Sequence, residues 1–195
     1  MNATINYDVY LIGVGGQGIG LLSEALIRAI DVAGFPVRGV DTHGLAQRGG
    51  TVTSHVRVGN RAHSPLIRPG AADVVIALER HEALRGMCSH LKDGGTIVYY
   101  DCEWQPLPVR LGKVKRLNPE LIVQESKCRK INLVRVFEES LSDPRMQNVA
   151  VISALIKNKV LPGITLKHFE AALKDLMSGD SLAQNLELVK RLSAA

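Results

Sequence analysis

The chain has 195 residues, of which 46% are hydrophobic and 22% charged, and a formal net charge of +5. This balance is typical of a globular protein with one sizeable core and excludes a disordered chain. No apolar run approaches the length of a membrane span, and residues 1–8 lack the basic and apolar regions of a secretory signal. We therefore expect a cytoplasmic protein with no membrane partner.

The first motif is a strand that runs into a glycine-rich turn and then a helix. The apolar run at residues 9–12 precedes Gly-Val-Gly-Gly-Gln-Gly at residues 13–18. Gly13, Gly15 and Gly18 satisfy the G-x-G-x-x-G spacing, in which glycine permits the tight turn and the approach of a phosphate to backbone N–H groups. The motif predicts a Rossmann-like start, although such glycines can also serve only to pack a helix against a strand.

Two neighbouring side chains bear on the ligand. Asp41 ends the next apolar run, at about the distance at which dinucleotide-binding folds place a ribose-binding acid. Gln17 adds a polar amide where an ordinary dehydrogenase needs none, and this amide is suited to contact a ligand or another chain. A bound dinucleotide therefore remains one interpretation among others.

Strand-like and helical patterns alternate along the following residues. We expect strands over residues 37–41, 51–58, 73–79 and 96–100, with helices over residues 21–33 and 80–91. Between residues 102 and 130 the pattern weakens, and prolines separate short β-like pieces such as 121–123. The final third is helical, with helix boundaries near Asp143-Pro144 and Pro162-Gly163.

These elements predict an α/β fold that is Rossmann-like, with a largely parallel sheet, helices on both faces and a helical C-terminal third. No linker, repeat or low-complexity segment interrupts the chain. We expect one domain over residues 1–195.

A second unusual segment follows the second predicted strand and reads Asp-Thr-His-Gly-Leu-Ala-Gln-Arg-Gly-Gly at residues 41–50. Ligands of open α/β sheets bind outside the carboxyl ends of strands, which is where this loop lies. Arg48 suits a phosphate or carboxylate, and Gly49 and Gly50 let backbone amides approach it. His43 suits either proton transfer or a simple hydrogen bond to a neighbour. We interpret the segment as a functional loop.

Other catalytic and metal motifs are missing from the sequence. The three cysteines, Cys88, Cys102 and Cys128, form no C-x-x-C pair, so local ligands for an iron–sulfur cluster or a structural zinc ion are not available. The sequence also contains no G-x-S-x-G elbow, no H-E-x-x-H pair and no P-loop. We predict no metal site in this chain.

Basic residues gather in the weakly patterned part of the chain: Arg110, Lys113, Lys115, Arg116, Lys127, Arg129 and Lys130. Aromatic residues make up only 4% of the chain and do not alternate with these cations, which argues against nucleic acid. A solvated basic face, or a docking surface for an acidic partner or a phosphorylated ligand, fits better.

The two glycine-rich segments together resemble the gamma subunit or domain of the 2-oxoacid:ferredoxin oxidoreductases. The similarity continues through the strand at residues 52–58 and the run at 73–79, and Asn148 matches an asparagine that recurs in this family. It covers most of the chain and is firmest over residues 7–80. His43-Gly44 and the short length look most like the beta subunit of indolepyruvate:ferredoxin oxidoreductase.

The resemblance implies an accessory subunit that completes an active site and is inactive alone. Family enzymes decarboxylate a 2-oxoacid on thiamine diphosphate, pass electrons through 4Fe–4S clusters to ferredoxin and release an acyl-coenzyme A. Thiamine diphosphate, magnesium and the clusters would lie on a larger partner subunit, with coenzyme A as cosubstrate. The implied catalytic residues are His43, Gln47 and Arg48. The implied cofactor-binding residues are Gly13, Gly15, Gly16, Gln17, Gly18, Gly44, Gly49, Gly50 and Asn148.

Two alternatives stay open at this point, a self-sufficient NAD(P)-dependent oxidoreductase and a non-enzymatic nucleotide-binding regulator. The sequence does not determine which 2-oxoacid is used, whether coenzyme A touches this chain, the stoichiometry of a complex or the role of residues 102–130.

Overall fold

The computed structural model describes residues 5–42, 49–104, 107–141 and 143–194. Its strands are β1 (Tyr7–Val14), β2 (Val37–Thr42), β3 (Thr51–Val58), β4 (Ala72–Ala77), β5 (Leu91–Tyr100) and β6 (Asn132–Val136). Its helices are α1 (Ile19–Val32), α2 (Arg80–Ser89), α3 (Leu107–Arg110), α4 (Glu120–Cys128), the 3-10 turn Pro144–Met146, α5 (Gln147–Lys157), α6 (Leu166–Leu176) and α7 (Gly179–Ala194).

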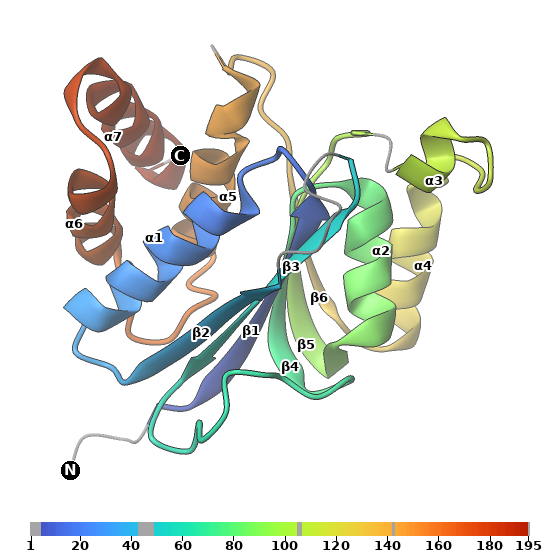
Figure 1. Cartoon of the computed structure of the whole chain (residues 1–195), viewed down its shortest axis with the longest axis horizontal. Helices are drawn as coiled ribbons and strands as arrows, with labels where there is room; N and C mark the ends of the chain where they lie inside the picture. Colours follow the sequence, from blue (N-terminus) through green and yellow to red (C-terminus); the bar gives the residue numbers. More distant parts are fainter. Residues whose placement is uncertain (1–4, 43–48, 105–106, 142, 195) are drawn as a thin grey trace.

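The six strands form one sheet in the order β2-β3-β1-β4-β5-β6 (Figure 1). Strands β1, β4, β5 and β6 are parallel, which confirms the predicted α/β fold and largely parallel sheet. Strand β3 runs antiparallel to both β1 and β2. The sheet is therefore mixed at the end formed by β2 and β3.

Helices cover both faces of the sheet. Figure 1 shows α1, α5, α6 and α7 on one face and α2 with α4 on the other. Successive side chains of β1 point to opposite faces of the sheet. Val9 and Leu11 pack with the first group of helices, whereas Tyr10 and Ile12 pack with the second. The fully buried strands thus read as continuous apolar runs in the sequence.

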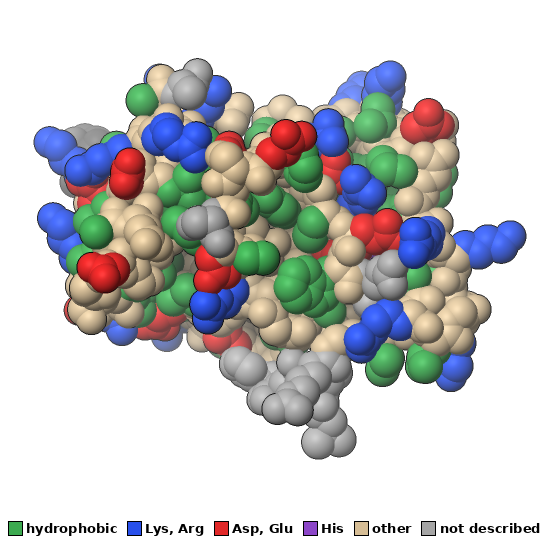
Figure 2. All heavy atoms as spheres, turned by 90° about the horizontal axis from the view of Figure 1, so that it is seen from above, with side chains coloured by type: hydrophobic (Ala, Val, Ile, Leu, Met, Phe, Trp, Pro, Cys, Tyr) green, Lys and Arg blue, Asp and Glu red, His purple; other side chains and the backbone are tan. Residues whose placement is uncertain are grey.

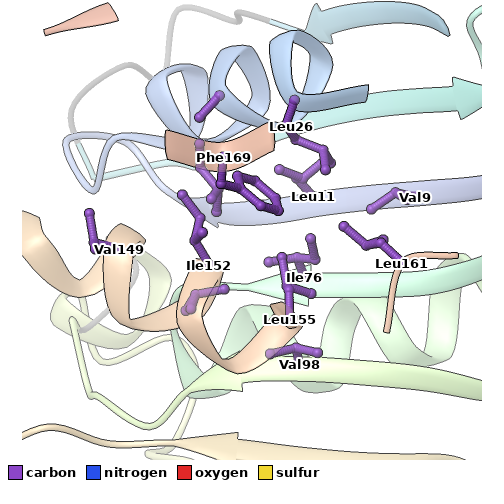
Figure 3. Close-up of a cluster of buried hydrophobic side chains, with 14 of the residues drawn as sticks. Val9, Leu11, Leu26, Ile76, Val98, Val149, Ile152, Leu155, Leu161 and Phe169 are labelled. Atoms are coloured by element: carbon purple, nitrogen blue, oxygen red, sulfur yellow. The ribbon is translucent and has the colours of Figure 1, made fainter. Parts of the chain in front are cut away.

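The larger core lies between the sheet and the helices of the first group. Leu26, Ile152 and Phe169 converge on Leu11 and Ile76 of the sheet (Figure 3). These side chains are each at most 1% exposed. This packing fixes α1, and therefore the turn before it, relative to the sheet.

The C-terminal third is helical, as predicted. The Asp143 carboxylate accepts a hydrogen bond from the N–H of Arg145 at 2.8 Å and begins the 3-10 turn before α5. Pro162 and Gly163 lie between α5 and α6, where the sequence predicts a break. No helix in the described parts of the chain is long and apolar enough to cross a bilayer.

One predicted element is wrong. Residues 121–123 are not a β-like piece but belong to α4, which begins after Pro119. Ile122 and Ser126, four residues apart, are its buried positions. The helix forms because this spacing lets one face pack against the sheet, where Ile122 joins the core on the α2 side.

Candidate functional site

The turn after β1 and the loop after β2 meet at the carboxyl end of the sheet. The N–H of Gly15 donates to the carbonyl oxygen of Gly50 at 2.8 Å, and the N–H of Gly49 donates to the carbonyl oxygen of Gly15 at 3.3 Å. These bonds continue the β1–β3 ladder beyond its last pair, Val14 and Thr51. The two glycine-rich segments singled out in the sequence therefore form one structural unit.

The crevice beside this unit is the switch point of the sheet. Helix α1 follows β1 on one face and α2 follows the neighbouring parallel strand β4 on the other (Figure 1). Where the helices after two adjacent strands leave in opposite directions, a crevice opens outside the strand ends, and this is the usual ligand position of such sheets.

The glycine turn borders an open hollow of about 300 Å³. The described residues that line it are small or apolar: Val14, Gly15, Gly16, Gly18, Ile19, Gly20 and Val52. Gly18 precedes α1 with φ 84° and supplies no side-chain cap. The N–H groups of the first helical turn have no intrahelical partner, so this helix end suits an anion.

Gln17 lies inside the protein and not in the hollow. Its side-chain oxygen accepts a hydrogen bond from the N–H of Val14 at 2.8 Å, and its side-chain nitrogen donates to the carbonyl oxygen of Leu78 at 2.6 Å. The residue is 1% exposed. The amide therefore contacts neither a ligand nor another chain; it joins the ends of β1 and β4 and holds the turn in shape.

Gly13 and Gly18 each leave room for a different neighbouring side chain. A Cβ on Gly13 would lie 2.9 Å from the side chain of Ile19, so this glycine permits the close approach of α1 to β1. A Cβ on Gly18 would lie 2.6 Å from Nδ2 of Asn148, and the positive φ disfavours any other residue there.

Asn148 lies next to the glycine turn, at the start of α5. Its Nδ2 donates to the carbonyl oxygen of Gly18 at 3.2 Å, while its buried Oδ1 has no hydrogen-bond partner among the described residues. It also lines a cavity of about 210 Å³ between α1, α5, α6 and α7. Asn148 thus holds the glycine turn through its hydrogen bond to Gly18.

Glu79 is a buried carboxyl group at the switch point that is not among the predicted site residues. It follows β4, is 0% exposed and accepts a hydrogen bond from the N–H of Glu82 at 3.1 Å. Its other oxygen has no partner in the described residues. Burial raises the pKa of Glu79 to about 7, with the N–H of Glu82 acting in the opposite direction.

The other buried acid here, Glu82, ties the second loop to α2. Its carboxylate accepts a hydrogen bond from Thr51 Oγ1 at 3.2 Å and pairs with Arg85 at 3.1 Å. Burial raises the pKa of Glu82, and Arg85 lowers it in part. Because Thr51 directly follows Gly50, this contact anchors the end of the glycine segment.

Cys102 lies beside Gln17. Its Sγ donates to the carbonyl oxygen of Leu78, and burial raises the pKa of this thiol to about 12, so the group is an unreactive thiol at neutral pH. The remaining cysteines, Cys88 and Cys128, are exposed and free. No group of three His, Cys, Asp or Glu side chains in the described ranges is placed to hold a metal ion.

Four predicted site residues, His43, Gly44, Gln47 and Arg48, lie outside the described residues. The end of their loop is nevertheless placed by Gly49 and Gly50. A Cβ on Gly49, which has φ 81°, would lie 2.5 Å from Nη2 of Arg110, so that guanidinium occupies the space over Gly49. This contact could not be predicted from the sequence, because Gly49 and Arg110 lie far apart along the chain.

The carboxylate of Asp41 accepts hydrogen bonds from two hydroxyl groups. Ser23 Oγ donates to the Asp41 carboxylate at 3.0 Å, and Ser54 Oγ donates to the same oxygen. The three side chains link α1, β2 and β3. Because the carboxylate already has these partners, the geometry gives no support to a ribose contact.

The fold and this crevice define an α/β protein with a glycine-rich turn at the switch point of a largely parallel sheet. The family model described as pyruvate ferredoxin/flavodoxin oxidoreductase matches residues 8–194. The chain belongs to this family.

Individual relatives agree with this membership. The indolepyruvate oxidoreductase subunit IorB of Archaeoglobus fulgidus is 32% identical over 187 residues, covering 94% of this chain and 92% of that protein. Among solved structures, the keto/oxoacid ferredoxin oxidoreductase gamma subunit of Geobacter sulfurreducens has a TM-score of 0.65 at 16% identity and covers 96% of both chains.

A third similarity is to part of a longer chain. The 2-oxoglutarate:ferredoxin oxidoreductase of Magnetococcus marinus has a TM-score of 0.72 at 19% identity, covering 99% of this chain but 32% of that one. At these identities the two solved structures show the shared fold. The fold of this chain therefore occurs both as a free-standing subunit and within a larger chain.

Proposed function

We propose that this chain is the accessory, gamma-type subunit of a 2-oxoacid:ferredoxin oxidoreductase, and that it completes the active site of a larger subunit. The observation that carries the proposal is the pairing of Gly15 with Gly49 and Gly50, which brings both glycine segments to one crevice. Family membership supports the reaction class, because the relatives named above are subunits or chains of such enzymes.

The hollow beside the glycine turn is our proposed site for the phosphate groups of coenzyme A. Its fit rests on the exposed backbone of Gly16 and Gly18 in the lining of the hollow and on the uncapped start of α1. Coenzyme A, when bound, supplies the thiol that takes up the acyl group. In this arrangement Gly13, Gln17 and Asn148 hold the turn in shape, and the neighbouring amides bind the anion.

The loop that ends at Gly49 and Gly50 is our proposed contact to the 2-oxoacid. Arg48 has the charge and fork geometry to bind its carboxylate, and Gln47 and His43 supply hydrogen bonds next to it. Gly44, Gly49 and Gly50 let the loop backbone approach the ligand closely. This assignment makes Arg48 the residue with the largest expected effect on turnover.

The partner subunit holds thiamine diphosphate, magnesium and the 4Fe–4S clusters in this proposal, and ferredoxin takes up the electrons in the cytoplasm. The sequence of this chain offers no C-x-x-C pair for a cluster. An aryl pyruvate, indolepyruvate first, is the proposed substrate, and the name of the Archaeoglobus relative supports that choice.

Reconstitution tests the proposal. We expect the isolated chain to show no 2-oxoacid-dependent viologen reduction, and its anaerobic mixture with the thiamine-binding subunit to show strong reduction that requires coenzyme A. A panel of indolepyruvate, phenylpyruvate, pyruvate and 2-oxoglutarate then ranks the substrates by kcat/KM. Equal activity of the larger subunit with and without this chain would contradict the proposal.

A further inference from the structure

Most of the large hydrophobic side chains that are exposed in the described residues belong to the segment around α3 and the start of α4. Six of the ten that are exposed in the described residues lie on or near α3 and α4: Trp104, Leu107, Leu111, Val114, Leu121 and Val123. We call this group the α3 surface. Leu111 is 57% exposed and Val114 49%. Exposed apolar side chains that are concentrated in one segment of a protein suit an interaction site.

The segment that carries the α3 surface is held to the protein mainly by polar bonds. The N–H of Leu107 donates to the carbonyl oxygen of Gly49 at 2.9 Å, and the N–H of Leu117 donates to His81 Nε2 at 3.1 Å. Leu117 packs against the core, but the leucines at positions 107 and 111 do not. The chain therefore gains little burial from these leucines on its own, and a partner would supply it.

Cations alternate with the apolar residues along this segment. Arg110, Lys113, Lys115 and Arg116 are all exposed, and within the described ranges only Arg116 forms an ion pair, with Glu103 at 3.2 Å. Figure 2 shows Lys and Arg side chains interspersed with hydrophobic ones at the right-hand end, where Figure 1 places α3. This charge favours an acidic partner and opposes pairing with a second copy of the same surface.

The α3 surface adjoins the candidate site directly. Leu107 and Arg110 both contact Gly49, which is bonded to Gly15 of the glycine turn. A partner seated on α3 therefore lies next to the crevice that needs completion. The single-chain relative, in which this fold occupies 32% of the length, gives the same reason to expect a large protein neighbour.

We propose that the α3 surface is the docking site of the larger, thiamine-binding subunit, which presents an apolar patch rimmed by Asp and Glu side chains. This inference rests on the proposed function. Apolar contacts at the centre hold the complex, and the cations accelerate its association and fix its orientation.

The test compares matched variants of the whole chain in binding to the purified larger subunit. Leu111→Asp and the double variant Lys113→Glu/Lys115→Glu change the α3 surface, and both expose no new core. Leu66→Asp, at a residue 55% exposed, and Lys167→Glu/Lys174→Glu on α6 are the controls. Circular dichroism and the unfolding midpoint confirm that each variant is folded.

We expect Leu111→Asp and the Lys113/Lys115 reversal each to weaken binding at least about tenfold, and the controls to stay within about threefold of wild type. The charge reversal also flattens the dependence of the association rate on salt. If wild type forms an active complex and the α3 variants bind equally well, the docking inference fails and the proposed function stands.

Two further outcomes would overturn the inference. If wild type does not bind the thiamine-containing subunit at all, the proposed function itself fails. If Leu111→Asp dissociates a dimer of this chain while the affinity for the larger subunit is unchanged, the α3 surface is a contact between copies. Sedimentation of each variant alone separates that case from docking of the larger subunit.

Discussion

Gly15 and Gly50 are joined by a backbone hydrogen bond of 2.8 Å that brings the turn after β1 and the loop after β2 together. Although a helix and a strand separate these two segments in the sequence, the bond brings them together beside one crevice. Because four of the residues that line the hollow are glycines, much of its wall is backbone, and its geometry depends on the residues that hold the turn.

The first prediction concerns Gly18. Gly18→Ala introduces a Cβ only 2.6 Å from Asn148 Nδ2 and forces alanine to adopt φ 84°. We expect a loss of roughly 1–3 kcal/mol in the free energy of unfolding, measured with urea. Gly20→Ala is the matched control, since its nearest neighbour would be 3.9 Å away, and it should be neutral or slightly stabilising. Equal stability of the two variants would contradict this role of Gly18.

The second prediction separates the two roles considered for Gln17. Gln17→Leu removes the partners of the Val14 N–H and the Leu78 carbonyl oxygen, both of which are buried. We expect it to lower the free energy of unfolding by about 2–4 kcal/mol. A residue that only contacted a ligand would instead lower turnover of the complex and leave the stability of the isolated chain unchanged.

The third prediction follows from the raised pKa of Glu79. In the folded chain this pKa is about 7 instead of its ordinary 4.5, so the folded state holds the proton more tightly than the unfolded state. The free energy of unfolding should therefore decrease as the pH rises from about 4.5 to about 7, by about 3 kcal/mol from this group, and then level off. Denaturant unfolding at several pH values measures this slope.

Glu79→Gln should remove this contribution and make the variant more stable than wild type at pH 8. Glu187→Gln, at an exposed position of α7, is the control and should leave the pH dependence unchanged. If Glu79→Gln and wild type lose stability in parallel between pH 4.5 and 7, Glu79 is not the group that titrates.

The fourth prediction concerns the loop residue Arg48. Arg48→Ala should lower turnover of the assembled complex, because a bidentate contact to the substrate carboxylate is lost, and it should leave the unfolding midpoint of the chain unchanged. The measurement is viologen reduction at saturating 2-oxoacid, with Arg68→Ala, at an exposed position before β4, as control. Unchanged turnover would remove Arg48 from the site.

Much of the fold could be predicted because its signals are local. The glycine turn, the buried strands and the amphipathic late helices each show their periodicity within a few residues. The direction of β3 could not be predicted in the same way, since its pairing partners lie on β1 and β2. The prediction of a β-like piece at residues 121–123 was wrong because a short run of Leu-Ile-Val suits a strand as well as a helix.

The candidate site was less predictable than the fold. The role of Gln17 depends on Leu78, which lies 61 residues away, and no spacing rule gives that contact. The same holds for Arg110 over Gly49 and for the burial of Glu79. Sequence motifs identified where the crevice lies, whereas long-range packing decides which side chains face it.

The most direct measurement is an anaerobic pull-down of the tagged chain from an extract of its native cells, with iron and thiamine assayed in the eluate. The proposed function predicts a larger partner that carries both iron–sulfur clusters and thiamine diphosphate. Recovery of the chain alone, with neither iron nor thiamine, would contradict it.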